Sequence, residues 1–528
     1  MKSIYFNFFQ IARFIRYSFF KRKELLKITN FFENSFSDYV VEDEDSVVLL
    51  DPFSVPEWMI TSSYFVNVLA NIKQSRIKTF SSDVQISHPV QKKIYKSINI
   101  AGHICTNLKS HKLIKEKEEI CKNISNQLKS KEDLINLEVH GIGIGIDIYE
   151  TYLTLENVTV NFDESLWVVV EEVVGLLLFW ENFIRKNVIS GVVLSHDCYK
   201  LNVLAKVCYR SDVPVFMPNT MGMQRVNHPF DLSRCRLPNY REYFNNLSNI
   251  EKKEGLKWGY ERLNQRLSGG IDEIAYAEVS AFIQPDNSQR ILKKSSKKKV
   301  LIAVHDFYDN PHAYGEMLFT DYYEWLIFLV EISKKVNYDW YIKTHPGYPP
   351  KLLKVMEEIL NEILKDSDIT ILPPKSSSIQ LTEEGLDFVL TCWGSVGHEF
   401  PLLGVQVINA SIVNPHMAYE FNWHPKSVKE YEKLLLNLPG LEKVIVPNDV
   451  YEFYYIHNKY TNLDDFIFNS HKQMLREIDP KQRFSIKVFL YFINGLSRNK
   501  HNKIIDDMKT FINSNKRNFF INGPEGEL

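Results

Sequence analysis

Short apolar runs that end abruptly in polar loops constrain the fold of this chain most. One run, residues 388–391, leads through a Gly/Ser loop and a predicted short helix into a further run at 405–408. Another, residues 338–342, leads into Lys343-Thr-His345-Pro346. Strand, loop, helix and strand in succession build an open parallel sheet. Ligands of such sheets bind beyond the carboxyl ends of the strands, so we expect a site there.

The two loops carry groups that suit an anionic ligand, and a nucleotide in particular. His345 offers an imidazole donor on a turn whose backbone Pro346 restricts. Ser395, Val396 and Gly397 open the predicted helix, and the N–H groups and dipole of a helix N-terminus favour a phosphate.

Three further residues of these loops belong to the same candidate site. Gly394 breaks the apolar run and lets the chain turn towards the helix. Glu399 lies one turn into the helix, where the dipole favours a carboxylate even without a ligand. Lys343 shares the face of His345 only if the strand continues that far.

Length and composition indicate a folded protein of two domains with additions. The chain has 528 residues, more than one core usually supports. Its 45% hydrophobic and 24% charged residues are typical of folded soluble proteins. A formal net charge of −2 gives no general attraction to polyanions, so we expect no nucleic-acid partner. The six cysteines form no C-x-x-C pair, which favours reduced thiols in a cytoplasmic protein.

The N-terminal segment, residues 1–26, mixes aromatic and basic side chains. It has neither a clean apolar stretch nor a small-residue cleavage site, so we do not expect a signal peptide. No apolar run in the chain is long enough to span a bilayer. An aromatic, basic helix would suit a peripheral contact with the inner face of the cytoplasmic membrane. A helix packed on its own domain explains the same residues.

Alternating strand and helix patterns predict an α/β protein with two Rossmann-like, doubly wound domains facing a cleft, and a helix at each end. The basic run at 293–299 would link the domains. The predicted divisions are an N-terminal helical segment at 1–45, a first domain at 46–292 with helical insertions, the linker at 293–299, a second domain at 300–480, and a C-terminal helix and tail at 481–528.

Three local expectations accompany this division. Residues 90–137 read as mostly helical, and residues 444–446 read as the last strand of the second sheet. The tail from Asn499 is polar, so we expect it to be loosely held.

A glycine-rich patch at residues 140–153 is the main candidate region of the first domain. Its G-x-G-x-G spacing lacks the strand-then-helix context of a dinucleotide fingerprint. It predicts a flexible loop that presents Asp147 and Glu150, although a tight turn between helices with surface carboxylates explains it equally. His196 and Asp197 follow a predicted buried strand and therefore lie at the functional edge of the sheet, where a histidine can also simply anchor a loop.

Six short motifs, taken together, resemble a known family. They are His305-Asp306…Asp309-x-Pro311-His312, Phe319-x-Asp321-Tyr-x-x-Trp325, Lys343-x-His345-Pro346, Gly394-Ser395-x-x-x-Glu399, Gly143-x-Gly145-x-Asp147-x-Tyr149-Glu150-x-Tyr152-Leu153 and Leu194-Ser195-His196-Asp197. The set resembles glycosyltransferases of bacterial capsule and surface polysaccharide synthesis, including the Kdo-transferase-like and CDP-glycerol-transferase-like branches. The resemblance spans about residues 135–410 and implies the GT-B plan of two tandem α/β domains.

The resemblance also implies roles for the second-domain residues. His345, with Pro346 beside it, would contact the donor phosphate, as a similar His-Pro element does in CMP-sialic-acid-using transferases. Glu399 would accept hydrogen bonds from the ribose hydroxyls. His305 and Asp306 would order the cleft or touch the donor.

In GT-B enzymes the base that deprotonates the acceptor usually comes from the first domain. Asp147 and Glu150 are therefore the first candidates for a catalytic base, and His196 and Asp197 the second. No D-x-D motif stands at a suitable strand end, and GT-B enzymes generally need no bound metal, so we expect neither a metal nor a cofactor beyond the nucleotide sugar.

The sequence thus predicts a metal-independent glycosyltransferase that extends a capsule, O-antigen or other lipopolysaccharide-type glycan. The first donor to consider is CMP-Kdo or a related CMP-ulosonic acid, because of the His-Pro pair. The acceptor would be a glycan or a lipid-linked glycan. A UDP-, GDP- or CDP-linked donor, a glycerophosphotransferase, an epimerase acting on UDP-sugars and a non-catalytic assembly partner with the same fold all remain open.

Overall fold

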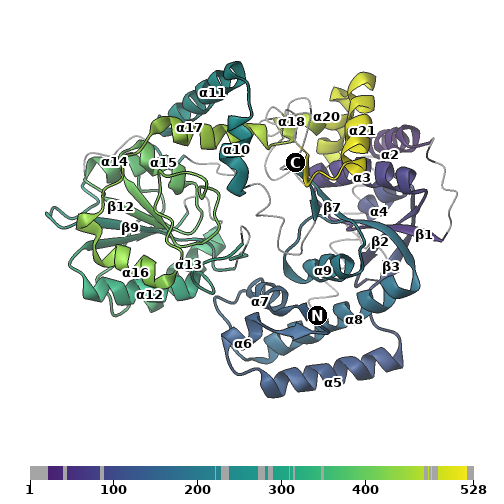
Figure 1. The fold of residues 1–528 in the computed structure, drawn as a ribbon, viewed down its shortest axis with the longest axis horizontal. Helices are drawn as coiled ribbons and strands as arrows, with labels where there is room; N and C mark the ends of the chain where they lie inside the picture. Colours follow the sequence, from purple (N-terminus) through teal and green to yellow (C-terminus); the bar gives the residue numbers. More distant parts are fainter. Residues whose placement is uncertain are drawn as a thin grey trace.

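The computed structural model describes residues 22–37, 39, 45–83, 89–219, 222–226, 237–270, 280–283, 289–308, 310–312, 315–345, 350–468, 474, 477–478 and 486–519. Two separate sheets organise these residues (Figure 1). The expected α/β fold with two Rossmann-like sheets is therefore confirmed. Residues 1–21, which include most of the predicted N-terminal membrane-contact helix, lie outside the described residues.

The first sheet has seven strands in the order β14-β8-β7-β6-β1-β2-β3. β3, β2, β1, β6 and β7 are mutually parallel, whereas β8 pairs antiparallel with β7 on one side and with the edge strand β14 on the other. The strands are β1 (Ser46–Leu50), β2 (Arg76–Ser81), β3 (Ile100–Cys105), β6 (Val188–Val193), β7 (Val215–Pro218), β8 (Met223–Val226) and β14 (Asn518–Phe519). A separate hairpin joins β4 (Glu138–Val139) to β5 (Ile142–Gly143).

Helices cover both faces of this sheet, as expected when crossovers connect parallel strands. They are α2 (Arg22–Ser35), α3 (Pro56–Lys73), α4 (Pro89–Lys96), α5 (His111–Gln127), α6 (Lys131–Ile135), α7 (Gly145–Leu153), α8 (Glu164–Lys186) and α9 (Asn202–Arg210), with α18 (Asp464–Ile467), α20 (Ile486–Gly495) and α21 (Arg498–Asn513) from the end of the chain. One core lies under α3, and a second lies under α7, α8 and α9.

The second sheet has five parallel strands in the order β11-β10-β9-β12-β13. They are β9 (Lys299–Ala303), β10 (Asp339–Lys343), β11 (Thr370–Ile371), β12 (Phe388–Thr391) and β13 (Gln406–Asn409). Its helices are α12 (Tyr322–Lys335), α13 (Pro350–Ile363), α14 (Ser378–Glu383), α15 (Val396–Leu402), α16 (Val428–Leu436) and α17 (Pro447–Tyr455). The direction in which successive strands are added to the sheet reverses between β9 and β12. Ligands of doubly wound sheets bind at such a switch point.

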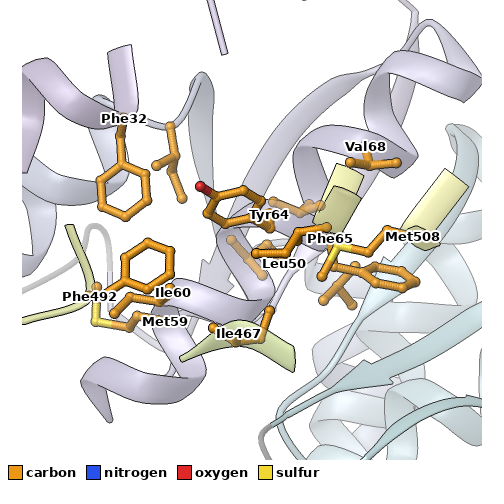
Figure 2. Packing of buried hydrophobic residues seen from close by; sticks show 14 of the residues in the cluster. Phe32, Leu50, Met59, Ile60, Tyr64, Phe65, Val68, Ile467, Phe492 and Met508 are labelled. Carbon is orange, nitrogen blue, oxygen red and sulfur yellow. The ribbon is translucent and has the colours of Figure 1, made fainter. Parts of the chain in front are cut away.

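Helices from each half of the chain pack on the opposite domain. α10 (Tyr240–Asn245) and α11 (Asn249–Leu267) share a core with α17 beside the second sheet. α20 and α21 return to the first sheet, where Phe492 and Met508 contact α3 around Tyr64 and Phe65 (Figure 2). The predicted boundaries at 293–299 and 480 assign 240–267 to the first domain and 464–478 to the second. In the structure the apolar side chains of 240–267 pack beside the second sheet, and Phe466, Ile467, Phe468, Met474 and Ile478 belong to the core of the first sheet.

The local expectations also differ from the structure at three places. Residues 100–105 form β3, because the short alternating run Ile100-Ala-Gly-His-Ile-Cys105 adds an edge strand within the stretch expected to be helical. Residues 444–446 form no strand, since Val444 is 85% exposed and pairs with no sheet. The expected loose tail contains α21, whose Ile504, Met508, Phe511 and Ile512 are buried at helical spacing.

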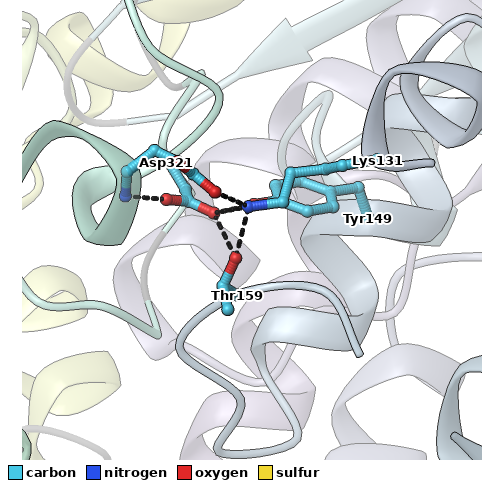
Figure 3. A network of polar contacts seen from close by, with 5 residues as sticks. Lys131, Tyr149, Thr159 and Asp321 are labelled. Atoms are coloured by element: carbon cyan, nitrogen blue, oxygen red, sulfur yellow. Dashed lines mark hydrogen bonds and ion pairs between the residues drawn. The ribbon is translucent and has the colours of Figure 1, made fainter. Parts of the chain in front are cut away.

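A polar network around Asp321 joins the two domains (Figure 3). The Asp321 carboxylate accepts hydrogen bonds from the Tyr149 hydroxyl, from Lys131 Nζ at 3.2 Å and from Thr159 Oγ1 at 3.0 Å. Its other oxygen accepts the Glu324 N–H at 2.6 Å and so caps α12. One buried side chain therefore starts a helix of the second domain and binds three residues of the first.

We predict that Asp321→Ala lowers the free energy of unfolding by about 2–4 kcal/mol, because it removes a cap and leaves buried donors without an acceptor. Ser427→Ala is the matched control, since Ser427 caps α16 within one domain only. It should cost about 1 kcal/mol. Equal losses in urea unfolding would show that the interdomain contacts of Asp321 contribute nothing to stability.

Candidate functional site

Asp147 lies inside the first domain as half of a buried ion pair. It is 1% exposed, and its Oδ2 lies 2.7 Å from Lys206 Nζ, while Oδ1 accepts from Asn202 Nδ2 at 3.0 Å. Burial raises the pKa of the Asp147 carboxyl to about 6, and Lys206 opposes that rise. The pair ties α7 to α9, so the structure places this predicted base away from solvent.

The glycine-rich patch owes its composition to close packing. A Cβ on Gly145 would lie 1.9 Å from the carbonyl oxygen of Leu134, so only glycine lets α7 start against α6. Lys206 Nζ also donates to the Gly143 carbonyl oxygen at 2.6 Å. The patch is thus a tight turn between packed elements, but both sequence interpretations expected accessible carboxylates, and Asp147 and Glu150 are buried.

Glu150 connects the first domain to the loop after β9. It is 3% exposed, and its Oε1 lies 3.0 Å from His312 Nδ1. His312 follows His305 and Asp306 in that loop, and the Asp306 carboxylate accepts the Tyr308 N–H at 3.0 Å, which fixes a tight turn. Glu150 therefore brings the candidate residues of the two domains together, and Asp306 shapes the loop that carries its partner.

Of the three candidate carboxylates of the first domain, Asp197 is the one that forms no ion pair with a lysine or histidine of the described residues. Its side chain is half-buried just after β6, and among described residues only its own backbone N–H contacts the carboxylate. Burial, and then the nearby Glu150 and Asp147 charges, raise the pKa of Asp197 to about 7, with Lys206 opposing. A carboxyl group with this pKa exchanges protons near neutral pH, as a general base requires.

His196 ends a chain of side chains that crosses from β1 to β6. Asp51 Oδ2 contacts Ser195 Oγ, which lies 2.7 Å from His196 Nδ1. Burial raises the pKa of Asp51 and lowers the pKa of His196, while their mutual attraction opposes both shifts. The imidazole stacks edge-on against Phe53 at 5.6 Å. His196 is thus fixed by its neighbours at the edge of the sheet, which agrees both with a functional role and with a loop-anchoring role.

His305 packs into the end of the second sheet next to the β12–α15 loop. Its Nε2 lies 3.4 Å from the Cys392 N–H and 3.2 Å from Thr391 Oγ1. An N–H can only donate, so Nε2 accepts and Nδ1 carries the proton of the neutral ring. Burial, followed by the proximity of His345, lowers the pKa of His305 to about 4. The ring stacks on Tyr322 at 4.9 Å.

Lys343 and His345 follow one another at the end of β10 with different exposure. Lys343 is buried, and its Nζ donates to the Ser376 carbonyl oxygen at 2.7 Å. Burial lowers the pKa of Lys343 to about 8, although Glu399 opposes the shift. His345 is exposed, and partial desolvation lowers its pKa, with Lys343 and Arg266 acting in the same direction and Glu399 against them. Pro346 lies outside the described residues.

The β12–α15 loop contributes one exposed group and several packed ones. Ser395 is exposed at the start of α15 and makes no side-chain cap bond. Gly394 N–H donates to Thr391 Oγ1 at 3.1 Å, and Val396 packs on a core of the second sheet. A Cβ on Gly397 would lie 2.3 Å from His416 Cε1, so packing against that ring requires this glycine.

Glu399 is 2% exposed and pairs with Arg266 from α11, whose Nε lies 2.5 Å from Glu399 Oε1. Sequence reasoning missed Arg266, because α11 was assigned to the other domain. It also did not show that Lys206 pairs with Asp147, that Asp51 contacts Ser195, or that His312 contacts Glu150. A lysine at Lys206 on the apolar face of a helix was the available signal, since such a residue needs a buried counter-charge.

Among the described residues, no group of three or more His, Cys, Asp or Glu side chains is arranged to hold a metal ion. No helix in the described ranges is long and apolar enough to cross a membrane.

No family model matches the sequence, and no curated protein matches it. Solved structures with a similar arrangement include the beta Kdo 2,4 transferase KpsC of Thermosulfurimonas dismutans, at 12% identity and TM-score 0.30, covering 50% of this chain and 79% of that one. A glycosyltransferase of Rickettsia africae has 11% identity and TM-score 0.25, covering 85% and 99%. UDP-GlcNAc 2-epimerase of Neisseria meningitidis, bound to UDP-GlcNAc, has 12% identity and TM-score 0.23, covering 82% and 98%. These similarities concern general architecture, and the roles of individual residues rest on their own contacts.

We predict that Lys206→Met lowers the free energy of unfolding by about 3–5 kcal/mol, because it leaves the Asp147 charge buried and unpaired. Lys200→Met is the control, since Lys200 pairs with Glu172 at 2.6 Å on the surface and should contribute less than about 1 kcal/mol. Urea unfolding measures both. A loss for Lys206→Met no larger than the control would mean that Asp147 is not held as an ion.

Proposed function

We propose that this protein is a glycosyltransferase that moves a sugar from a nucleotide-activated donor to a glycan or lipid-linked glycan acceptor. One observation carries the proposal: Lys343 and His345 stand at the carboxyl end of β10, the neighbour of the switch strand β9, and the Glu150–His312 contact joins that domain to the edge bearing Asp197. A phosphate-binding group and a carboxyl that titrates near pH 7 are the two parts that glycosyl transfer needs.

The proposed donor site is the loop edge of the second sheet. The exposed imidazole of His345 would donate a hydrogen bond to the donor phosphate, and the Lys343 ammonium behind it would offset the negative charge on the departing nucleotide. Side chains of this chain would meet that charge in place of a metal ion. His305, with Nε2 accepting from the loop, would hold the β12–α15 loop in place.

Asp197 is the proposed base. As a carboxylate it would take the proton of the attacking acceptor hydroxyl while the bond from the sugar to the donor phosphate breaks. Burial would keep its pKa near 7, and the charges of Glu150 and Asp147 would add to that effect. These two residues were the first candidates from the sequence. Their ion pair and interdomain contact make them better suited to position Asp197 than to accept a proton from substrate.

The finer parts of the proposal concern donor and setting. We take a CMP-linked ulosonic acid such as Kdo as the first donor to test, supported by the Lys343-x-His345-Pro346 sequence. The acceptor would be a capsule or O-antigen-type glycan at the inner face of the cytoplasmic membrane, reached through the aromatic and basic residues at 1–26. No other cofactor is proposed.

A thermal-shift panel of CMP, CDP, UDP, GDP and ADP tests nucleotide binding. One nucleotide should raise the melting temperature, since a ligand at about 100 times its Kd stabilises the folded state by about 2.7 kcal/mol. His345→Ala should reduce that shift and leave the unliganded melting temperature unchanged, because His345 is exposed. CMP would favour the ulosonic-acid donor. No shift with any nucleotide would contradict the proposal and favour a non-catalytic assembly partner.

The pH dependence of transfer tests the base. The Asp197 carboxylate predominates above about pH 7, and the Lys343 ammonium below about pH 8, so kcat/KM should be highest between these values. Asp197→Asn should lower kcat by about 10²–10⁴-fold, the usual contribution of a general base, with nucleotide affinity retained. Asp147→Asn is the comparison. A larger kcat loss for Asp147→Asn, with the fold intact, would assign the base role to Asp147.

A further inference from the structure

Arg266 is held at two points, although nothing in the sequence marked it as a site residue. Its Nε donates to the buried Glu399 carboxylate at 2.5 Å. Its guanidinium carbon lies 5.8 Å from the centre of the Phe282 ring, within range of a cation–π contact. The side chain is 13% exposed. A guanidinium fixed on one edge and one face has lost most of its freedom before any ligand arrives.

The other edge of the Arg266 guanidinium is uncommitted. Among the described residues, no oxygen accepts a hydrogen bond from its two terminal nitrogens. Arginine presents five N–H donors in a planar fork, and only the one on Nε is used here. These nitrogens are not among the buried side-chain atoms of the described residues that lack a hydrogen-bond partner, so they keep contact with water and a ligand oxygen can reach them.

The uncommitted edge of the Arg266 guanidinium lies near the residues of the proposed donor site. Glu399 lies on α15, one turn after the exposed Ser395, and its charge acts on both Lys343 and His345. Arg266 in turn acts on His345. Arg266 from α11 therefore contacts the Glu399 carboxylate directly, and Lys343 and His345 at the end of β10 lie near enough to interact electrostatically with it.

We propose that Arg266 binds the donor phosphate through its terminal N–H groups, with Glu399 as the positioning residue that holds it. Two parallel N–H···O bonds from a guanidinium fit a phosphate better than a point charge does. Glu399 would then act on the nucleotide through Arg266, in place of the ribose contact implied by the family resemblance. This inference rests on the proposed function, because it needs a nucleotide at the same site.

The test is calorimetric titration of the full chain with CMP, CDP, UDP, GDP and ADP, and with the corresponding nucleosides. For the nucleotide that the unaltered protein binds, Arg266→Ala should raise Kd about 10- to 100-fold, as expected for hydrogen bonds between charged groups. The Kd of the nucleoside, which has no phosphate, should change less than about threefold. Arg266→Lys keeps the charge without the fork and should fall between.

Arg262→Ala is the matched control, because Arg262 lies one turn earlier on α11, over the Trp258 ring at 5.7 Å. It should leave Kd unchanged. A Kd for Arg266→Ala within threefold of the unaltered protein would overturn the inference alone and leave Arg266–Glu399 as an ion pair between helices. Equal losses for nucleotide and nucleoside would overturn it too. If the unaltered protein binds none of the five nucleotides, the inference and the proposed function both fail. Should Arg266→Ala not fold, Arg266→Lys decides by the same criteria.

Discussion

The position of the two domains depends on one carboxylate, that of Asp321. It accepts from Tyr149, Lys131 and Thr159 of the first domain while it caps α12 of the second. A buried carboxylate is stable only when its lone pairs are satisfied, so none of these donors can leave without cost. Tyr149 and Glu150 are neighbours on α7, and the Asp321 network therefore also fixes where Glu150 meets His312. The proposed site inherits its geometry from this junction.

Exchange of helices between the domains strengthens the same junction. α10 and α11 leave the first domain to pack beside α17, and α20 and α21 return from the second to cover α3. The chain thus crosses between the domains more than once, and each crossing ends in a buried apolar face. Arg266 at the end of α11 is a consequence, because it lies beside the second sheet only since α11 packs there. A residue assigned by sequence position to the acceptor domain thereby becomes a candidate for the donor phosphate.

Sequence patterns predicted the sheets well, because buried parallel strands leave a strong local signal. The runs at 300–304, 338–342, 388–391 and 405–408 each overlap a strand of the second sheet to within one residue at either end. Patterns were poor where the outcome depended on a distant partner. Val444 looks like a strand residue but has no sheet to pair with, and α21 looks polar until α3 covers its apolar side. The sequence placed His345 and Asp197 at strand ends, yet it did not show that Arg266 would meet Glu399 or that Lys206 would neutralise Asp147.

The three carboxylates at the edge of the first domain show how environment separates residues of one chemical type. Asp147 has Lys206 at 2.7 Å and is withdrawn from solvent, and Glu150 has His312 at 3.0 Å. Asp197 has neither partner: burial raises its pKa to about 7, and the negative charge of the other two adds to that rise. Asp147 and Glu150 therefore have two effects: their contacts hold α7 in place, and their charges raise the proton affinity of Asp197. The glycine-rich patch is better understood as the packing that makes this arrangement possible than as a ligand loop, since Gly145 allows α7 to begin where Asp147 can reach Lys206.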